Sequence, residues 1–422
     1  MRCLYGLLVR LATPAVFAYF LWRARREPAY RHGWSQRLGR LPPECPRGAV
    51  WIHAASVGEV QAIVPVIEDL LAWQPECPVV VTTLTPAGRD RVAERLGERV
   101  HHCYLPLDLP GAVRRFLAQL RPRLGIIVEM ELWPELLAAA RSRGLAMHLV
   151  NARLSATTLR RYQRLHGLFR EALSSFEHIA AQTDADRNRL MTLGAPPERV
   201  TVSGNIKFDQ PLDHDQLEAG EQLRRQLGTD RPIWVAASTR EGEEEQALTA
   251  FARVREDLPK AGLILVPRHP QRFDGIARLV AERGYRLQRR SNNQPPDAAT
   301  DVYLGDSVGE MGHYLTAGDV VFVGGSLVPV GGHNLLEPAA IGRPVIVGPH
   351  RFNFTAVADL LESNAALVTV HDAAELAAAV TDLLTDEYRR HEMAMAAQRC
   401  VTANQGARQR LLERLKTAIQ NQ

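Results

Sequence analysis

Short apolar runs alternate with amphipathic stretches along most of this 422-residue chain. The runs that predict buried strands are 49–54, 79–83, 124–128, 147–150, 178–181, 233–237, 263–266, 301–304, 320–323 and 345–347. The segments between them, such as 59–73 and 109–120, place apolar residues at helical spacing. Regular alternation of strands and helices predicts parallel sheets covered by helices on both faces, so the fold class is α/β.

One polar stretch, residues 209–220, interrupts the alternation. We interpret it as a linker between two doubly wound, Rossmann-like domains at 27–208 and 221–385. Residues 386–422 predict one or two amphipathic helices that pack back as a terminal brace. In doubly wound sheets, ligands bind beyond the carboxyl ends of the strands. Functional residues are therefore expected in the loops after strands, along a central cleft between the two domains.

Residues 1–26 form a separate apolar and basic segment. From residue 3 to residue 22 the sequence is apolar except for Arg10 and Thr13, and residues 1–40 hold eight arginines against Glu27 alone. This pattern predicts a membrane anchor, either a single span or a helix at the interface; a buried core helix is the structural alternative. The basic cluster after Trp22 favours anionic lipid and places the following domains in the cytoplasm.

Cysteine spacing and the absence of known motifs exclude several kinds of site. The five cysteines are scattered without a Cys-x-x-Cys pair, which argues against a disulfide framework or a structural zinc site and favours a reducing compartment. The sequence contains no Walker A loop, no Gly-x-Gly-x-x-Gly fingerprint and no His-Glu-x-x-His motif. Asp184 with Asp186, and Asp213 with Asp215, match a metal-binding carboxylate pair. The first pair lies inside a predicted helix start and the second lies in the predicted linker, so we expect no metal site.

A glycine loop stands at the centre of the second half. Gly331 and Gly332 follow the apolar run 320–323 and precede a predicted helix. Glycines let a ligand approach the backbone, and the free N–H groups of a helix's first turn favour phosphate, so the layout predicts an anion site. Asn334 is the predicted N-cap, and Glu337 stands where a capping-box partner would be. Capping alone is the alternative explanation of this stretch.

Two loops in the first half carry carboxylates. Ser56 is a predicted N-cap, and Glu59 falls in the first turn of the helix that follows. Glu59 is either a general base or a first-turn charge favoured by the helix dipole. Glu129 and Glu131 follow a predicted strand, and in extended chain both would point the same way, to bind hydroxyl groups or to shift each other's pKa. Glu131 is equally explained as N-terminal charge for the helix that Pro134 begins.

The second half offers further anion-binding candidates. Pro267 and Arg268 follow a predicted strand, and the Arg268 guanidinium can meet phosphate with two parallel hydrogen bonds, although a surface arginine is the alternative. Residues 307–311 follow the strand at 301–304 and are predicted to open another helix toward the same cleft. Several such loops in one half favour an anionic, nucleotide-like ligand over capping alone.

Seven segments are specific in combination and in order. They are the N-terminal anchor, Ser56-Val57-Gly58-Glu59, Glu129-Met130-Glu131-Leu132-Trp133-Pro134, Asn151-Ala152-Arg153-Leu154-Ser155, Ser203-Gly204-Asn205-Ile206-Lys207-Phe208-Asp209, Pro267-Arg268-His269-Pro270 and Gly331-Gly332-His333-Asn334-Leu335-Leu336-Glu337-Pro338. With these segments, nearly the whole chain resembles the 3-deoxy-D-manno-octulosonic acid (Kdo) transferases of lipopolysaccharide assembly. Those enzymes have the two-Rossmann-domain glycosyltransferase fold known as GT-B.

The resemblance implies an inverting transferase that moves Kdo from CMP-Kdo to a lipid A precursor, lipid IVA, without a metal or other cofactor. It implies Glu59 as the catalytic base, with Ser56, Glu129 and Glu131 on the acceptor side. It implies donor contacts from Pro267, Arg268, Val308, Gly309, Glu310, Met311, Asn334, Leu335, Leu336 and Glu337. The implied partners are CMP-Kdo, the lipid A precursor and anionic lipids of the inner membrane, with catalytic domains on its cytoplasmic face and no nucleic acid.

Two alternatives of other kinds stay open from the sequence. One is another GT-B transferase of lipid A assembly that uses a UDP-sugar as donor. The other is a non-catalytic membrane tether that keeps a degenerate GT-B fold. The presence of Glu59 and Arg268 counts against the tether.

Overall fold

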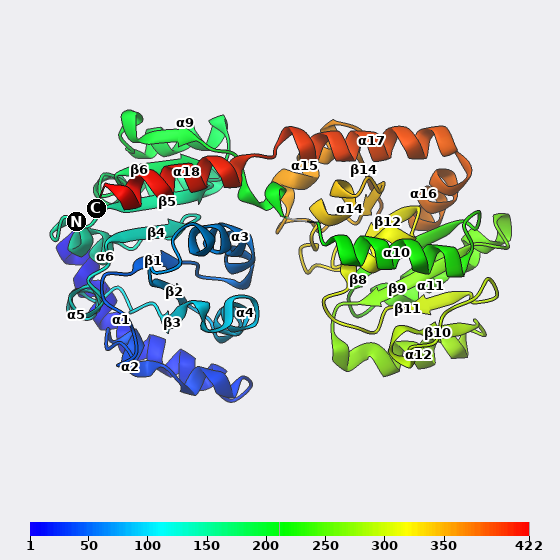
Figure 1. Cartoon of the computed structure of the whole chain (residues 1–422), viewed down its shortest axis with the longest axis horizontal. Helices are drawn as coiled ribbons and strands as arrows, with labels where there is room; N and C mark the ends of the chain where they lie inside the picture. Colours follow the sequence, from blue (N-terminus) through cyan, green and yellow to red (C-terminus); the bar gives the residue numbers. More distant parts are fainter. Residues whose placement is uncertain (211, 422) are drawn as a thin grey trace. The chain divides into compact units, whose positions relative to one another are not determined.

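The structure, a computed structural model, describes residues 1–210 and 212–421. The chain forms two compact units: unit 1 contains residues 1–210 and 405–422, and unit 2 contains residues 211–404. Each unit is built on one parallel sheet with helices on both faces (Figure 1). The predicted α/β class with two doubly wound domains is confirmed.

Unit 1 contains a seven-stranded sheet in the order β3-β2-β1-β4-β5-β6-β7. Its strands are β1 (Val50–His53), β2 (Val79–Thr83), β3 (His101–Tyr104), β4 (Leu124–Val128), β5 (Met147–Ala152), β6 (His178–Ala181) and β7 (Val200–Val202). The chain changes direction across the sheet at β1, because β2 and β3 lie on one side of it and β4 to β7 on the other. The loop that leaves β1 therefore lies at the switch point, where ligands of such sheets bind.

Several helices of unit 1 begin where a side chain or a proline can satisfy their first backbone groups. Ser56, Thr85 and Thr183 each accept a hydrogen bond from the N–H of the residue three positions on. The helices are α1 (Arg2–Arg23), η1 (Pro28–Arg31), α2 (Trp34–Arg37), α3 (Val57–Trp73), α4 (Pro86–Leu96), η2 (Gly97–Arg99), α5 (Pro110–Leu120), α6 (Pro134–Arg141), α7 (Ala156–Gln163), α8 (His166–Leu173), α9 (Asp184–Leu193), η3 (Pro197–Arg199), η4 (Ile206–Asp209) and α18 (Ala407–Gln420).

Unit 2 repeats the plan with a seven-stranded parallel sheet in the order β10-β11-β9-β8-β12-β13-β14. Its strands are β8 (Ile233–Thr239), β9 (Gly262–Pro267), β10 (Leu287–Arg289), β11 (Val302–Leu304), β12 (Val320–Val323), β13 (Val345–Val347) and β14 (Leu367–Thr369). Its helices are α10 (His214–Leu227), α11 (Glu243–Asp257), η5 (Pro270–Arg272), α12 (Phe273–Glu282), η6 (Arg290–Asn292), α13 (Met311–Ala317), α14 (Leu336–Ala340), α15 (Thr355–Ser363), α16 (Ala373–Thr385) and α17 (Glu387–Ala403).

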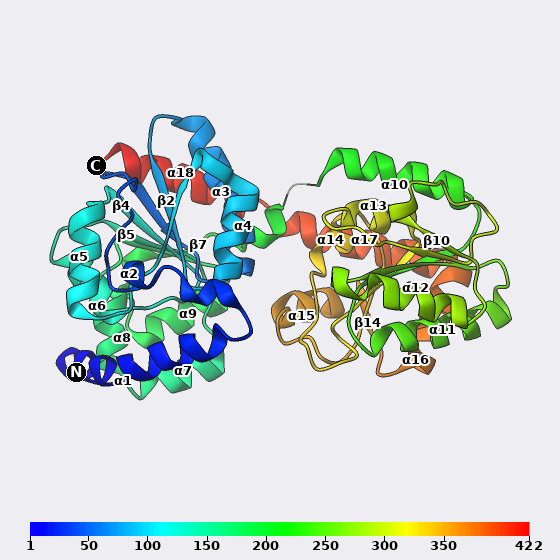
Figure 2. The same ribbon diagram turned by 90° about the horizontal axis from the view of Figure 1, so that it is seen from below.

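The predicted domain boundaries at 209–220 and 386–422 differ from the structure. Helix α10 begins at His214 with Asp213 as its N-cap and packs against α13, so most of the predicted linker is a helix of unit 2. Residue 211 of that stretch and residue 422 of the terminal stretch lie outside the described residues. The two terminal helices belong to different units. Helix α17 packs on α14, α15 and α16 of unit 2, whereas α18 packs on α3 of unit 1 (Figure 2).

Helix α18 is an integral part of unit 1. Its apolar face buries Leu411, Leu415 and Ile419 in the core on one side of the first sheet. The Asp209 carboxylate accepts hydrogen bonds from the N–H groups of Gly406, at 2.6 Å, and Arg408, at 2.9 Å, and so caps the start of this helix. The chain therefore leaves unit 1 after η4, builds unit 2 and returns.

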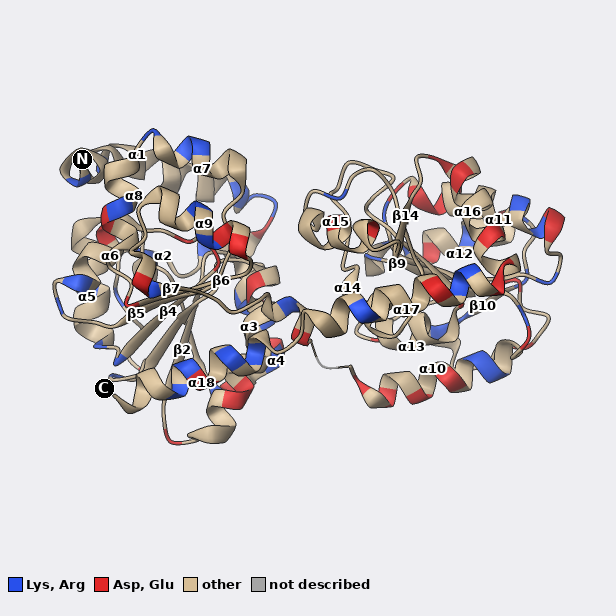
Figure 3. Ribbon diagram, turned by 90° about the horizontal axis from the view of Figure 1, so that it is seen from above, with Lys and Arg blue, Asp and Glu red and all other residues tan. Residues whose placement is uncertain are grey.

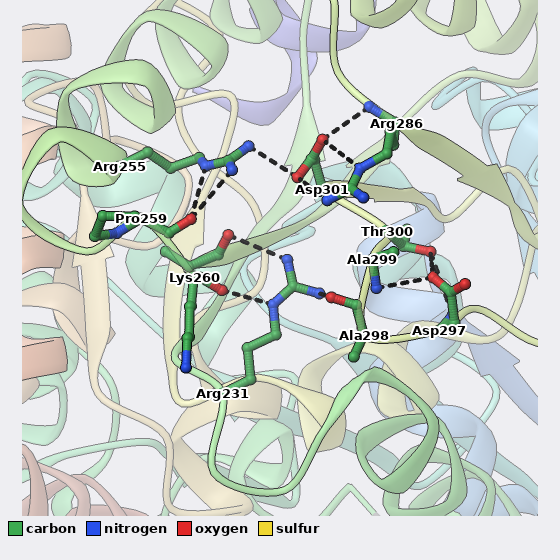
Figure 4. A network of polar contacts seen from close by, with 11 residues as sticks. Arg231, Arg255, Pro259, Lys260, Arg286, Asp297, Ala298, Ala299, Thr300 and Asp301 are labelled. Atoms are coloured by element: carbon green, nitrogen blue, oxygen red, sulfur yellow. Dashed lines mark hydrogen bonds and ion pairs between the residues drawn. The ribbon is translucent and has the colours of Figure 1, made fainter.

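A polar network ties the amino ends of three strands of unit 2 (Figure 4). The Arg231 guanidinium donates to the carbonyl oxygens of Lys260, Ala261 and Ala298, and the Asp301 carboxylate lies 2.8 Å from Arg255. These residues precede or adjoin the starts of β8, β9 and β11. The network lies at the edge of the sheet opposite to the carboxyl ends of its strands, so its role is structural.

Candidate active site

The turn from β1 into α3 holds Glu59 in a reciprocal cap. Ser56 Oγ accepts a hydrogen bond from the Glu59 N–H at 3.3 Å and donates to Glu59 Oε1 at 2.8 Å. Glu59 Oε2 accepts from the Ala55 N–H at 2.7 Å. The predicted cap is therefore present, and it fixes the carboxylate at the carboxyl edge of the first sheet.

Burial sets the protonation of this carboxylate. The Glu59 side chain is only 8% exposed, and desolvation raises its pKa from 4.5 to about 7. The hydrogen bonds from Ser56 and Ala55 oppose that rise, and the negative charges of Glu129 and Glu131 add to it. A carboxylate with a pKa near neutrality can accept a proton at the pH of the cell.

The two other carboxylates of this edge face different partners. Glu129 has a left-handed backbone conformation with φ of 60°, so the prediction that Glu129 and Glu131 lie in extended chain is wrong. Glu129 Oε1 lies 2.8 Å from Lys207 Nζ, whereas Glu131 Oε2 lies 3.9 Å from His53 Nε2. His53 is fully buried at the end of β1, and its Nε2 has no hydrogen-bond partner among the described residues.

Unit 2 gathers two arginines and two histidines at the carboxyl edge of its sheet. Arg240 follows β8, Arg268 and His269 follow β9, and His333 lies in the glycine loop after β12. Arg240 Nε lies 3.1 Å from His333 Nε2, and another nitrogen of the same guanidinium contacts the His269 ring. We call Arg240, Arg268, His269 and His333 the cationic cluster.

The two arginines carry the positive charge of the cationic cluster, because its histidines resist protonation. Burial, together with the positive charges of Arg240 and Arg268, lowers the pKa of His333 from 6.5 to about 4. Burial and the same kind of repulsion lower the pKa of His269. The carboxylate of the adjacent Glu243 already has hydrogen-bond partners. It accepts hydrogen bonds from four backbone N–H groups, those of Arg240, Gly325, Ser326 and Leu327. An anionic ligand would relieve this repulsion.

The glycine loop differs in detail from the prediction. Asn334 is not the N-cap of α14, which begins at Leu336 with Leu335 in the cap position. The Asn334 side chain nevertheless acts locally: its Oδ1 accepts from the Leu336 N–H at 3.0 Å, and its amide donates to Glu337 Oε1 at 3.0 Å. Burial raises the pKa of Glu337, with Asn334 and Arg268 opposing the rise.

The segment 308–311 also begins its helix later than predicted. Gly309 has φ of 86°, a left-handed conformation that cannot continue an α-helix, and α13 starts at Met311. Val308 is exposed, and the Glu310 carboxylate lies 2.8 Å from Arg290. Helices α13 and α14 are short, so the arginine and histidine side chains are the stronger anion-binding groups of this edge.

The acidic pairs that the sequence suggested for metal binding have structural partners. Asp186 accepts hydrogen bonds from the Leu154 N–H and from Thr183 Oγ1, and Asp213 caps α10. Among residues 1–210 and 212–421, no group of three or more His, Cys, Asp or Glu side chains is placed to hold a metal ion.

Comparison with known proteins decides the family. Residues 32–210 match the family described as 3-deoxy-D-manno-octulosonic-acid transferase (kdotransferase), and residues 228–399 match the glycosyl transferases group 1. The chain is 38% identical to the 3-deoxy-D-manno-octulosonic acid transferase of Haemophilus influenzae, over 99% of each chain. The chain belongs to the Kdo transferase family. The Kdo transferase of Bordetella pertussis is 40% identical over 98% of this chain and 99% of its own.

Two solved structures are similar to this chain, and the second of them agrees with the fold. The C-terminal CMP-Kdo binding domain of WaaA from Acinetobacter baumannii is 34% identical over 45% of this chain and 99% of its own, with a TM-score of 0.43. A UDP-GlcNAc 2-epimerase from Neisseria meningitidis aligns over 87% of this Kdo transferase and 100% of its own chain, with a TM-score of 0.57 at 15% identity. At that identity the likeness shows the fold alone, which is GT-B, as predicted.

Several residues beside these candidate groups were not among the predicted site residues. Arg240 was considered at a strand end and ranked below Arg268, with which it forms the cationic cluster together with His269 and His333. His53 and Lys207 face Glu131 and Glu129. Each lies within or directly beside a segment that the sequence singled out. Their signal was position at a strand end, which marks the carboxyl edge of a parallel sheet for every residue type and not for carboxylates alone.

Proposed function

We propose that this Kdo transferase moves Kdo from CMP-Kdo to a hydroxyl group of lipid IVA, with inversion at the anomeric carbon and with Glu59 as general base. The observation that carries the proposal is the Glu59 carboxylate, which lies at the carboxyl edge of the unit 1 sheet with its pKa raised to about 7. Such a group is substantially ionised at neutral pH and is basic enough to accept a proton from an attacking hydroxyl.

In the proposed step, a glucosamine hydroxyl oxygen attacks the anomeric carbon of Kdo while its proton passes to Glu59. The bond between that carbon and the phosphate oxygen of CMP breaks, and its electron pair leaves with the phosphate. One displacement without a covalent intermediate inverts the anomeric carbon. Ser56 orients the base, and Glu129 and Glu131 are proposed to bind acceptor hydroxyl groups.

The cationic cluster supports a donor site in unit 2. The phosphate of CMP-Kdo and the carboxylate of Kdo are both anions, and Arg240 and Arg268 can each donate charge-assisted hydrogen bonds to them. Pro267 ends β9, and the segments 308–311 and 334–337 follow β11 and β12 at the same edge. We propose that they contact the nucleoside part of the donor.

We propose that the step needs no metal or other cofactor, because preorganised arginine side chains can stabilise the charge that develops on a leaving phosphate. We also propose that the enzyme acts at the cytoplasmic face of the inner membrane. Helix α1 supports a membrane location, because it is 22 residues long, apolar and mostly exposed.

The test is mass spectrometry of the products after the full chain is incubated with CMP-Kdo and tetraacyl lipid A precursor. We expect the acceptor to gain the mass of Kdo with release of CMP, and no sugar to be transferred from a UDP-sugar. An acceptor that stays unmodified, or that gains sugar from the UDP-sugar, would contradict the proposal.

Binding measurements test the donor site separately. The parent should prefer CMP over UMP and UDP. Arg268→Ala should weaken CMP binding by about 1.5 to 3 kcal/mol, or roughly 10- to 150-fold, because it removes a charge-assisted contact. Arg278→Ala is the control, since Arg278 is an exposed arginine of α12, the α-helix that follows Arg268 in the chain. Equal affinities of the Arg268→Ala variant and the parent would remove Arg268 from the donor site.

A further inference from the structure

Helix α1 is apolar on two opposite faces. The inner face presents Tyr5, Gly6, Val9, Thr13, Phe17 and Phe20 at helical spacing, and all six are partly or fully buried. The outer face presents large apolar residues that are about half exposed or more, namely Leu4, Leu7, Leu8, Leu11, Leu21 and Trp22. Soluble surfaces rarely carry a contiguous apolar patch of this size without a partner.

The inner face contacts the rest of unit 1 near both ends of the helix. At the amino end, Arg2 forms an ion pair with Glu171 of α8, and Tyr5 donates a hydrogen bond of 2.9 Å to Asp108. At the carboxyl end, the ring centroids of Phe17 and Trp34 are 5.1 Å apart. The Arg37 guanidinium lies 4.5 Å above the Phe20 ring.

These contacts are incompatible with a membrane span. A helix of 22 residues is about 33 Å long, close to the thickness of the hydrocarbon core, so a span would need the whole of α1. To cross the bilayer, α1 would have to break every contact with unit 1, or the polar surface of unit 1 would have to enter hydrocarbon. A helix held along one side can instead lie in the plane of the interface.

Charge selects an anionic lipid surface as the partner of the outer face. Arg10, Arg25, Arg26 and Arg31 are exposed in or just after α1, and Glu27 is the single acid among residues 1–40. Figure 3 shows α1 as a mostly uncharged helix. A symmetric dimer through this face would bring like charges of two copies together, whereas anionic headgroups attract them.

We propose that α1 is an in-plane membrane helix whose outer face, made of Leu4, Leu7, Leu8, Leu11, Leu21 and Trp22, inserts into the headgroup region of an anionic bilayer while its inner face stays bound to unit 1. The Arg26 guanidinium lies 5.6 Å from the Trp22 ring, so the carboxyl end pairs an interfacial aromatic residue with a cation for lipid phosphate.

The same contacts place the bilayer surface beside the active edge of unit 1. Asp108, which holds Tyr5, also accepts hydrogen bonds from the N–H groups of Glu135 and Leu136 in the first turn of α6. Arg37 donates to the Leu84 carbonyl oxygen, directly after β2. Both attachments lie at the carboxyl ends of strands, the edge that holds Glu59. A membrane-resident acceptor would thus meet this edge; that step rests on the proposed function, while the placement of α1 does not.

Nitroxide labels on the full chain test the placement directly. In a background of Cys3→Ser and Cys45→Ser, single labels are introduced at Leu4, Leu8, Leu11 and Trp22, and the protein is bound to phosphatidylethanolamine–phosphatidylglycerol vesicles. An in-plane helix predicts similar shallow depths at all four positions, each reduced by ascorbate added outside. A label at Leu11 much deeper than its neighbours, with a label at Leu4 protected from ascorbate, would show a span and overturn the proposal.

Substitutions test whether lipid is the occupant. Leu7→Ser, Leu8→Ser and Leu11→Ser in one chain should lower the vesicle partition coefficient by about 100-fold or more, given the apolar area removed from the bilayer, with an unchanged melting curve. Tyr388→Ser is the matched control, since Tyr388 is 78% exposed on α17. If the triple variant kept the parent's vesicle binding, or instead converted a lipid-free dimer into a monomer, the outer face would not be the membrane surface. The label-depth and vesicle-binding measurements need neither CMP-Kdo nor a lipid acceptor. Their results therefore test the membrane placement of α1 even if the transfer assay fails.

Discussion

At the residue scale, the Glu59 carboxylate combines two roles. Its hydrogen bonds with Ser56 and Ala55 cap α3, and its burial raises its pKa to about 7. A cap contributes to stability and a general base contributes to turnover, so one substitution can separate the two contributions.

We expect Glu59→Gln to keep the size of the side chain while removing its ability to accept a proton. Single-turnover transfer at saturating CMP-Kdo should fall by about 10² to 10⁴, with CMP affinity unchanged. Glu375→Gln is the matched control, because Glu375 is an exposed first-turn glutamate of α16. A folded Glu59→Gln variant within about tenfold of the parent's rate would transfer the role of base to Glu129 or Glu131.

The raised pKa has opposite consequences for activity and stability. The parent's rate should fall about tenfold per pH unit below about 7, because a protonated carboxyl group cannot act as base. The folded state binds this proton more tightly than the unfolded state, so the stabilising contribution of Glu59 is complete below pH 4.5 and is lost as pH rises through about 7. Both dependences should be absent from the rate profile and the urea midpoints of Glu59→Gln.

From the sequence, candidate site residues could be predicted better than the side chains that contact them. Glu59 and Arg268 could be predicted because each directly follows an apolar strand. His53 and Lys207 could not be assigned to Glu131 and Glu129, since those pairs form only when separate strands and loops meet at one edge. The left-handed backbone at Glu129 gives no sequence signal, because glutamate rarely adopts it.

At the element scale, central strands were predictable and edge strands were not. The runs at 79–83, 124–128, 178–181, 320–323 and 345–347 coincide with β2, β4, β6, β12 and β13. The four missed strands, β3, β7, β10 and β14, lie at the edges of the two sheets. Edge strands are half solvated, so they lack the continuous apolar run that a strand buried on both faces requires.

The two histidines His148 and His178 lie buried on neighbouring strands of unit 1, within reach of the Arg414 charge from α18. Burial lowers the pKa of both from 6.5 to about 4, and the Arg414 charge adds to the effect. The folded state therefore resists protonating them. Their neutral forms favour folding above pH 6.5, and this contribution is lost as pH falls toward 4.

We expect acid to weaken unit 1 through these two histidines. In urea unfolding between pH 6 and pH 4.5, the double variant His148→Leu, His178→Leu should reduce the slope of unfolding free energy against pH by up to about 1.4 kcal/mol per pH unit for each histidine. His371→Gln controls for an exposed histidine. An unchanged slope in the double variant would assign the acid sensitivity to other groups.

At the scale of the whole molecule, unit 2 separates a structural network from the proposed donor site at opposite edges of its sheet. In unit 2 the Arg231 network binds the amino ends of the strands, and the cationic cluster lies beyond their carboxyl ends. The two edges should therefore respond independently to substitution.

We expect Arg231→Ala to lower the unfolding free energy of unit 2 by about 0.5 to 1.5 kcal/mol. The partly buried Ala261 carbonyl group loses its donor, whereas the exposed carbonyl groups of Lys260 and Ala298 can bind water instead. CMP affinity should remain that of the parent. Arg268→Ala should give the reverse pattern, weak CMP binding with an unchanged melting curve. A loss of CMP affinity in a folded Arg231→Ala variant would contradict this separation.

The two-unit organisation followed from the strand pattern, but the path of the chain between the units did not. The polar stretch 209–220 reads as a linker, yet Asp213 caps a helix whose few apolar residues suffice to pack on α13. The sequence alone did not divide the terminal stretch 386–422 between the units, and only the complete fold shows that α17 and α18 belong to different units.

That return of the chain has a consequence for its synthesis. Unit 1 lacks the helix that covers one apolar face of its sheet until residues 405–421 have been translated. Residues 211–404 must be made first, which takes about 10 to 40 seconds at typical rates of elongation. Throughout that interval, the nascent unit 1 exposes the apolar surface that Leu411, Leu415 and Ile419 later cover. Helix α1 is translated before the rest of the chain and is already free to meet a bilayer. A ribosome that stalls within unit 2 would therefore leave an open hydrophobic core held at a membrane surface.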